Sequence, residues 1–179
     1  MAQLKKYSIA FSGLSLGKHE FSFDIDSKFF ELIENPEFAG TVGEAFVTLT
    51  KQSTMLVLDF HIKVSIQQTC DRCLAEAPIK LESENQLIVK FGEKEDNDND
   101  EILVLPHTES EVNIAQYLYE YVFIMIPLQK VLCELNNDTS ICDQEVLSKI
   151  NQHKVNTQPE SAQDDVDPRW QQLKNIKLN

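Results

Sequence analysis

Hydrophobic and polar side chains alternate along roughly the first half of the chain, and this pattern predicts β-strands. The clearest alternation keeps six apolar side chains on one parity: Leu56, Leu58, Phe60, Ile62, Val64 and Ile66. The other parity of this segment is mostly polar, so we expect a long antiparallel strand with one face on a core and one in water. We expect it to pair with residues 43–51 through a turn at 51–54.

Shorter alternations predict further strands. Residues 7–11 and 21–25 each place apolar side chains on one parity, and a glycine-containing turn separates them. Residues 81–91 repeat the pattern with interruptions, and "EILVLP" predicts a last short strand. Between the strands, residues 27–36 predict a short helical turn that Pro36 helps to end.

The apolar spacing then changes to that of a helix, with Ile114, Tyr117, Leu118, Tyr121, Val122 and Met125 on one face. We expect an amphipathic helix at about 111–126, begun by a capping box from Thr108 to Glu111 and ended by Pro127. The predicted fold class is α+β: a mostly antiparallel β-sheet or partial barrel with one packed amphipathic helix. This β-rich globular domain spans residues 1–135.

Residues 136–179 form a polar tail in which we expect partial disorder. Its end, "DPRWQQLKNI", predicts a short helix in which Asp167 caps the start, Pro168 takes the first helical position and Trp170 lies on the apolar face. This helix docks either onto its own domain or onto a partner, and the sequence leaves both interpretations open.

The net charge of −13, from 16 basic and 29 acidic residues, disfavours broad binding to nucleic-acid phosphates. A basic protein partner suits this charge, although the charge can also serve solubility alone. No export signal is recognisable, and the longest apolar run, "YVFIMIPL", is too short to cross a bilayer. We therefore expect a cytoplasmic protein with no membrane contact and with reduced thiols.

The cysteines form one tight pair and one looser pair: Cys70 with Cys73, and Cys133 with Cys142. Four thiolates suit a structural zinc ion, and a Cys-x-x-Cys pair presents two sulfurs at the right separation. A thiol-redox pair is a second interpretation, but such motifs favour a βαβ setting instead of a turn between antiparallel strands. Four unrelated reduced thiols are the third.

Catalytic motifs are missing from the sequence. It contains no glycine-rich phosphate loop, no Gly-x-Ser-x-Gly and no His-Glu-x-x-His. We therefore predict that the protein is not an enzyme, and we identify no small-molecule substrate.

Several short motifs occur in one order: "CDRCL" at a strand end, an acidic loop, a helix closing in "IPL", then "CDQEVL" and a terminal "DPRW". In this the chain resembles the YceD-like family of large ribosomal RNA subunit accumulation proteins over essentially its whole length. The resemblance implies a bacterial, intracellular protein linked to 23S rRNA accumulation and large-subunit assembly, with no established catalytic activity.

The motif positions that carry over are Cys70, Arg72, Cys73, Cys142, Asp167, Pro168, Arg169 and Trp170. Relatives often have a histidine near Leu132, where this chain has Cys133, and zinc accepts either ligand. We predict that the four cysteines bind structural zinc. The predicted partner contacts are Arg72, Asp167, Pro168, Arg169 and Trp170.

The predicted function is a non-enzymatic factor that binds a basic ribosomal protein or a large-subunit assembly intermediate, with rRNA contacted indirectly. Direct rRNA binding is one alternative, and thiol-redox chemistry at Cys70 and Cys73 is the other.

Overall fold

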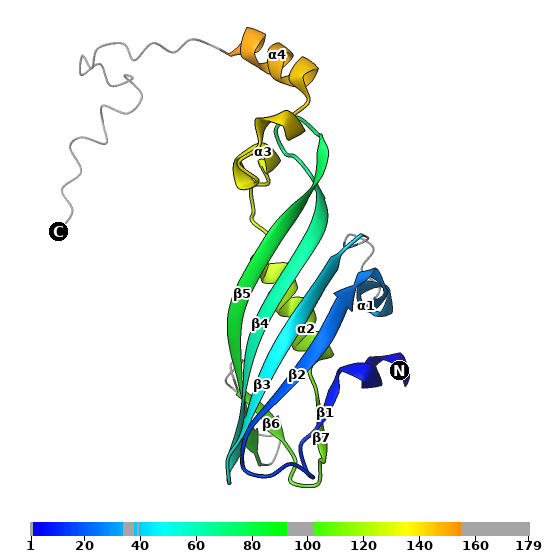
Figure 1. Ribbon diagram of the computed structural model, residues 1–179, viewed down its shortest axis with the longest axis vertical. Coiled ribbons are helices and arrows are strands. Elements are labelled where there is room, and N and C mark those ends of the chain that lie inside the picture. The colour runs from blue at the N-terminus through cyan, green and yellow to red at the C-terminus, as the bar shows by residue number, and fades with distance from the viewer. Residues whose placement is uncertain (1, 34–37, 39, 93–101, 155–179) are drawn as a thin grey trace, which may run out of the picture. The chain divides into compact units, whose positions relative to one another are not determined.

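The computed structural model describes residues 2–33, 38, 40–92 and 102–154 of the chain. In this part, the main sheet has five strands in the order β2-β3-β4-β5-β6 (Figure 1). They are Gly17–Asp26 (β2), Val42–Lys51 (β3), Met55–Thr69 (β4), Glu76–Phe91 (β5) and Ile102–Leu105 (β6). Neighbours are antiparallel except β5 and β6, which are parallel. The predicted α+β class is confirmed, and the curved sheet is open, with β2 and β6 at its edges.

Strand β4 buries the apolar side chains that the sequence pattern places on one face. Its six apolar side chains from Leu56 to Ile66 are each at most 4% exposed. Burying a side chain of this size contributes about 1.5–3 kcal/mol, so a one-residue slip in register would forfeit most of that stabilisation. The predicted pairing with β3 is confirmed, with Leu58 opposite Leu49.

A second, two-stranded sheet corrects the predicted start of the helix. Strand β1 (Ser8–Ala10), which follows the 3-10 helix η1 (Ala2–Tyr7), pairs with β7 (Glu111–Asn113). The predicted capping box from Thr108 to Glu111 is therefore wrong, because the backbone that follows it is extended and pairs with β1. Helix α2 begins at Ala115, whose N–H donates to Oδ1 of Asn113 at 3.0 Å.

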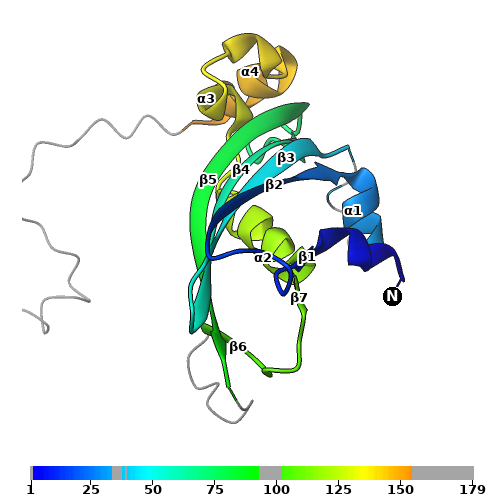
Figure 2. The ribbon, with the colours of Figure 1, turned by 60° about the horizontal axis from the view of Figure 1, so that its bottom comes forward.

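Helix α2 (Ala115–Met125) lies on the concave side of the curved sheet (Figure 2). It buries Ala115, Leu118 and Val122, and the Tyr121 ring meets Phe60 of β4 with centroids 5.2 Å apart. The aromatic and apolar stripe is therefore core packing, as predicted. Helix α1 (Ser27–Leu32) adds to this core: Asp26 accepts from the Phe29 N–H at 3.0 Å and caps the helix, which buries Phe29 and Phe30.

After residue 130 the described chain contains three short helices, of which the last two lie beyond residue 136, where we expected partial disorder. These are α3 (Leu132–Leu135), the 3-10 helix η4 (Thr139–Ile141) and α4 (Gln144–His153). The chain divides into two compact units, residues 1–143 and 144–179. In the second unit, an ion pair of 2.6 Å between Glu145 and Lys149 supports α4. The predicted tryptophan-bearing helix lies outside the described residues.

Candidate functional site

The connection between β4 and β5 is a tight turn that carries Cys70 and Cys73. The Cys70 N–H donates to the Ala75 carbonyl at 2.8 Å, and the Leu74 N–H donates to the Cys70 carbonyl at 2.9 Å. Leu74 has a φ of +61°, a conformation that a residue with a side chain adopts at some cost. We call residues 70–75 the cysteine turn. The predicted position of Cys70 at a strand end is confirmed.

Two hydrogen bonds fasten the cysteine turn to the segment that follows α2. The Asp71 N–H donates to the Lys130 carbonyl at 2.9 Å, and the Lys130 N–H donates to Oδ2 of Asp71 at 2.7 Å. The chain then enters α3, which carries Cys133, and η4, after which Cys142 follows. None of the four cysteines forms a disulfide and all are buried, at 0 to 5% exposure: Cys70, Cys73, Cys133 and Cys142.

Arg72 of the cysteine turn contacts the second pair of cysteines. Its Nη2 donates to the sulfur of Cys133 and lies 3.6 Å from the sulfur of Cys142. Its Nη1 forms an ion pair of 2.8 Å with Oε1 of Glu134. The hydrogen bond to Cys142, followed by the nearby negative groups, raises the pKa of Arg72 despite partial burial. Its Nε is buried without a partner among the described atoms.

The surroundings of Cys70 favour a thiolate. Burial by itself would raise the pKa of this thiol. Hydrogen bonds from the backbone N–H groups of Cys73, Arg72 and Leu132, together with the Cys73 side chain, outweigh burial and lower the pKa below its ordinary value. A sulfur that accepts several N–H groups is electronically prepared to act as a metal ligand or as a nucleophile.

These contacts connect the four cysteines through Arg72 and Leu132, but they do not amount to a metal cage. Within residues 2–33, 38, 40–92 and 102–154, no group of three or more His, Cys, Asp or Glu side chains is arranged to hold a metal ion. The donor chemistry fits zinc, because buried thiols with N–H donors around the sulfur suit a structural zinc site. The zinc prediction therefore stays a prediction.

Comparison with known protein families shows to which family the chain belongs. The model of the family described as large ribosomal RNA subunit accumulation protein YceD matches residues 58–177. The chain belongs to the YceD family. The predicted resemblance is thus confirmed, and the match runs from β4 through all four cysteines. Comparison with curated proteins and with solved structures gave no match.

The description of the YceD family links it to accumulation of large-subunit ribosomal RNA. In the described part of the chain, no helix combines the length and apolar character that a membrane span requires. Of the predicted partner contacts, Arg72 has a side chain 36% exposed beside the thiols. The others lie outside the described residues: Asp167, Pro168, Arg169 and Trp170.

Sequence reasoning missed what Arg72 touches in this YceD-family chain. A basic residue inside a Cys-x-x-Cys motif was a usable signal, because a cation next to thiols favours their thiolate form. Asp71 was also missed, although a short acidic side chain in a turn commonly accepts from a backbone N–H. Neither residue type revealed its partner, since Lys130, Cys133 and Cys142 are distant in sequence.

Proposed function

We propose that this YceD-family protein is a non-enzymatic factor that supports 23S rRNA accumulation and large-subunit assembly. It does so by binding a basic ribosomal protein or an assembly intermediate in the cytoplasm, where thiols stay reduced. Family membership supports the link to large-subunit RNA. The net charge of −13 is the observation that carries the choice of a protein partner.

The net negative charge of the chain favours a basic protein over bare rRNA as the partner. Affinity for the phosphate backbone comes mainly from lysine and arginine side chains that displace counterions, and the chain has 16 basic residues against 29 acidic ones. Ribosomal proteins are rich in the basic side chains that this surface attracts, and opposite fields accelerate encounter. The effect on rRNA is then indirect: a ribosomal protein kept available for assembly protects the RNA that it joins.

We further propose that Cys70, Cys73, Cys133 and Cys142 hold a structural zinc ion. Support comes from the burial of all four thiols and from the N–H groups directed at the Cys70 sulfur. Zinc bound there would tie α3 and η4 to the cysteine turn, because both cysteine pairs would hold one ion. A redox role is less favoured, because reactive cysteines are partly exposed and Cys70 is fully buried.

A nuclease-resolved pull-down tests the function. The full chain, expressed with an affinity tag in bacterial cells, is recovered with and without ribonuclease, and bound proteins and RNA are identified. We expect a basic large-subunit protein to remain bound after ribonuclease and to be released as salt rises, since exposed charges are screened within about 8 Å at physiological ionic strength. Recovery of rRNA fragments without any ribosomal protein would instead establish direct RNA binding.

A further inference from the structure

The main sheet has a second face, opposite the core, whose side chains are exposed or half-buried. On it, β2 to β5 carry the polar parity of each strand, and Phe46 of β3 stands among these side chains with 45% exposure. An exposed aromatic side chain among polar side chains on an open sheet face gains little from core packing. Its exposed ring offers apolar contact area to a ligand that also has groups for the polar neighbours.

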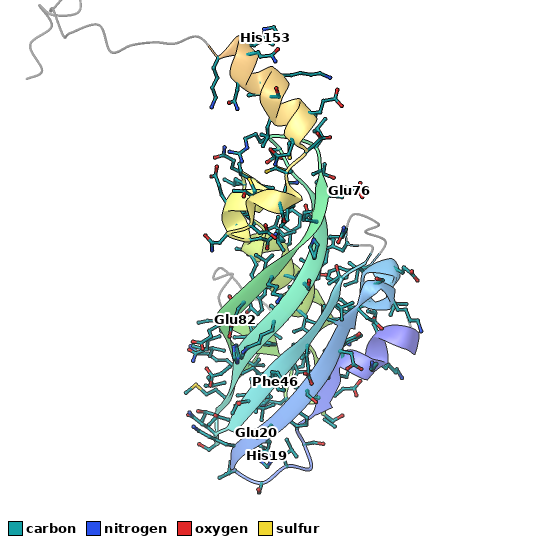
Figure 3. All side chains as sticks on the ribbon, turned by 45° about the horizontal axis from the view of Figure 1, so that its top comes forward. His19, Glu20, Phe46, Glu76, Glu82 and His153 are labelled. Atoms are coloured by element: carbon teal, nitrogen blue, oxygen red, sulfur yellow. The ribbon has the colours of Figure 1, made fainter. Side chains whose placement is uncertain are left out.

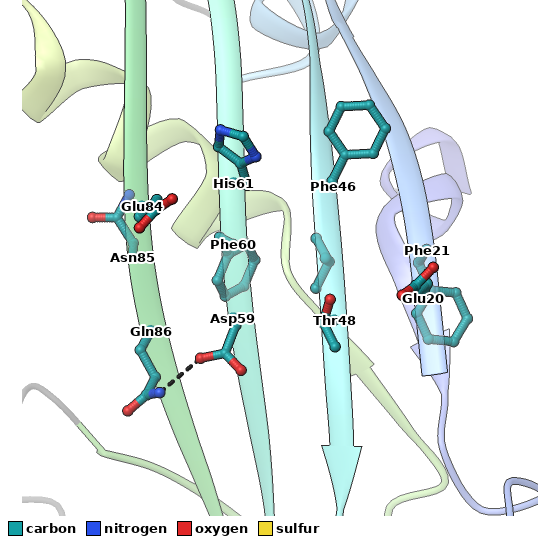
Figure 4. A pocket seen from close by; sticks show the side chains of 11 residues that line it. Glu20, Phe21, Phe46, Thr48, Asp59, Phe60, His61, Glu84, Asn85 and Gln86 are labelled. Atoms are coloured by element: carbon teal, nitrogen blue, oxygen red, sulfur yellow. Dashed lines mark hydrogen bonds between the residues drawn. The ribbon is translucent and has the colours of Figure 1, made fainter. Parts of the chain in front are cut away.

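The strand register places the side chains of this face in rows. One row runs Ser22, Phe46, His61 and Glu84, and the next runs Glu20, Thr48, Asp59 and Gln86. Figure 3 shows Glu20 and Phe46 on neighbouring strands. Both rows border one surface hollow, which we call the Phe46 hollow (Figure 4).

The Phe46 hollow carries negative charge. Its lining residues include the carboxylates of Glu20, Asp59 and Glu84 and no lysine or arginine. Asp59 accepts a hydrogen bond of 2.7 Å from Gln86, and no ion pair is formed by any of the three carboxylates within the described part of the chain. An approaching cation therefore meets carboxylates that are still available.

Lys63 and Lys6 are paired with acids that do not line the hollow. Lys63 lies 3.0 Å from Glu82, and His61 contacts the same carboxylate at 2.6 Å. Lys6 pairs with Asp24 at 3.1 Å on the neighbouring row. The acidic residues of the hollow consequently keep their attraction for a positive ligand.

An exposed ring and nearby carboxylates together suit arginine better than lysine. A guanidinium can stack on an aromatic face while its N–H groups donate in their plane to carboxylate oxygens. The centroid of the His61 ring lies 6.4 Å from that of Phe46 on the neighbouring strand, which adds a second ring to the surface that a guanidinium can contact. A phosphate-bearing ligand would be repelled by the same three carboxylates.

We propose that the Phe46 hollow binds an arginine-bearing segment of a basic protein, with a guanidinium over Phe46 and its N–H groups on Glu20, Asp59 or Glu84. The proposal deepens the proposed function, on which it rests for the identity of the partner: it assigns to one sheet face the contact with a basic ribosomal protein.

A labelled oligo-arginine peptide is the probe, titrated against the full chain at low salt. The variant Glu20→Gln/Asp59→Asn/Glu84→Gln should bind at least about tenfold more weakly, because each exposed ion pair contributes modestly. The control variant Glu76→Gln/Glu109→Gln/Glu111→Gln removes the same charge from exposed sites elsewhere. Its affinity for the peptide should fall by about twofold at most. Equal losses in the two variants would reduce the effect to net charge and overturn the proposal.

The ring is tested separately with Phe46→Leu, which stays apolar and keeps all charges. We expect about threefold weaker binding of oligo-arginine, and little change for an oligo-lysine peptide of the same length. Identical behaviour of the two peptides would contradict stacking on Phe46. An RNA oligonucleotide that binds the wild-type chain and is lost in the Glu20/Asp59/Glu84 variant would also overturn the proposal. Thermal melts confirm that each variant is folded.

The pull-down distinguishes failure of this inference from failure of the proposed function. If the wild-type chain and the Glu20/Asp59/Glu84 variant retain the same ribosomal protein equally, the function stands and the Phe46 hollow is wrong. If the wild-type chain binds oligo-arginine through the hollow but recovers no ribosomal protein, the hollow stands and the function fails.

Discussion

Nη2 of Arg72 lies 3.6 Å from the sulfur of Cys142, although 70 positions separate the two residues along the chain. The same guanidinium contacts Cys133 and pairs with Glu134. One cation thus joins the cysteine turn to α3 and to the residue after η4.

Arg72→Met keeps an unbranched, flexible stem but removes the guanidinium, and with it the charge and the donors. We expect the melting temperature to fall by about 3 °C, because Glu134 and two sulfurs lose their partner. Lys80→Met, which removes a lysine from the exposed surface of β5, serves as the control and should shift it by less than about 1 °C. A pair of variants with equal melting temperatures would show that the Arg72 contacts contribute nothing to stability.

Zinc content tests the proposed metal site. Protein purified without chelator under reducing conditions should carry about one zinc ion per chain, and serine substitution at any of the four cysteines should lower that content by at least about half. His107→Gln, an exposed potential ligand in another part of the chain, should leave the zinc content unchanged. Elemental analysis that finds no metal in the fresh wild-type protein would rule the site out.

Leu74→Gly should stabilise the protein. The positive φ of +61° at this position is unfavourable for a residue with a Cβ, and the Leu74 side chain is 72% exposed, so little packing is lost. We expect a gain of about 0.5–1 kcal/mol in the free energy of unfolding, measured by urea denaturation. In the adjacent control, Ala75→Gly, the free energy of unfolding should instead fall by about 0.5–1 kcal/mol. A destabilised Leu74→Gly protein would indicate that the leucine makes a contact of its own.

Gly43→Ala should destabilise β3. A Cβ at this position would lie 2.4 Å from the Lys63 carbonyl oxygen and 2.5 Å from Cγ1 of Val64, so the two strands would have to separate. We expect a loss of about 2 kcal/mol in the free energy of unfolding. Gly13→Ala is the matched control, because a Cβ there meets nothing within 4 Å. Similar denaturation midpoints for both variants would contradict the close approach.

Tyr7 predicts a dependence of stability on alkaline pH. Burial, and then Asp26 and Asp24, raise the pKa of Tyr7 from 10.0 to about 12, and its hydroxyl donates to the Asp24 carbonyl at 3.0 Å. Because the folded state holds the Tyr7 proton more tightly than the unfolded state, the protonated hydroxyl stabilises the folded protein. This stabilisation is complete below pH 10 and is lost as the pH rises towards 12.

The Tyr7→Phe variant should therefore have a free energy of unfolding about 1 kcal/mol lower than the wild-type protein at neutral pH. The difference in free energy of unfolding between Tyr7→Phe and the wild-type protein should narrow between pH 10 and 12. Comparing the two proteins cancels the titration of all other groups. A difference that stays constant through this range would show that Tyr7 does not titrate with a raised pKa.

Local periodicity was sufficient for much of the fold. The parity of β4 and the spacing of Leu118 and Val122 in α2 each reflect one face buried against a core, and the structure confirms both. Side-chain alternation of period two and helical spacing are properties of a single segment, so they can be detected without knowing what the segment packs against.

Pairing between distant short segments could not be predicted in this way. Glu111–Asn113 has too few residues to show a period, and it is a strand because β1 lies beside it. The same holds for β6, whose parallel pairing with β5 depends on how the intervening chain returns. The capping pattern at Thr108 was a local signal that tertiary pairing overrode.

The sequence by itself determined the long strand that ends just before Cys70, the cysteine turn, the α2 core stripe, the acidic balance and the family relationship, because each depends on residues close together or on composition. Only the tertiary structure decided that Arg72 lies against Cys133 and Cys142, and that three carboxylates line one hollow with Phe46. Those neighbours come from separate strands and helices, and the register that places them side by side follows from burying the opposite face of the sheet.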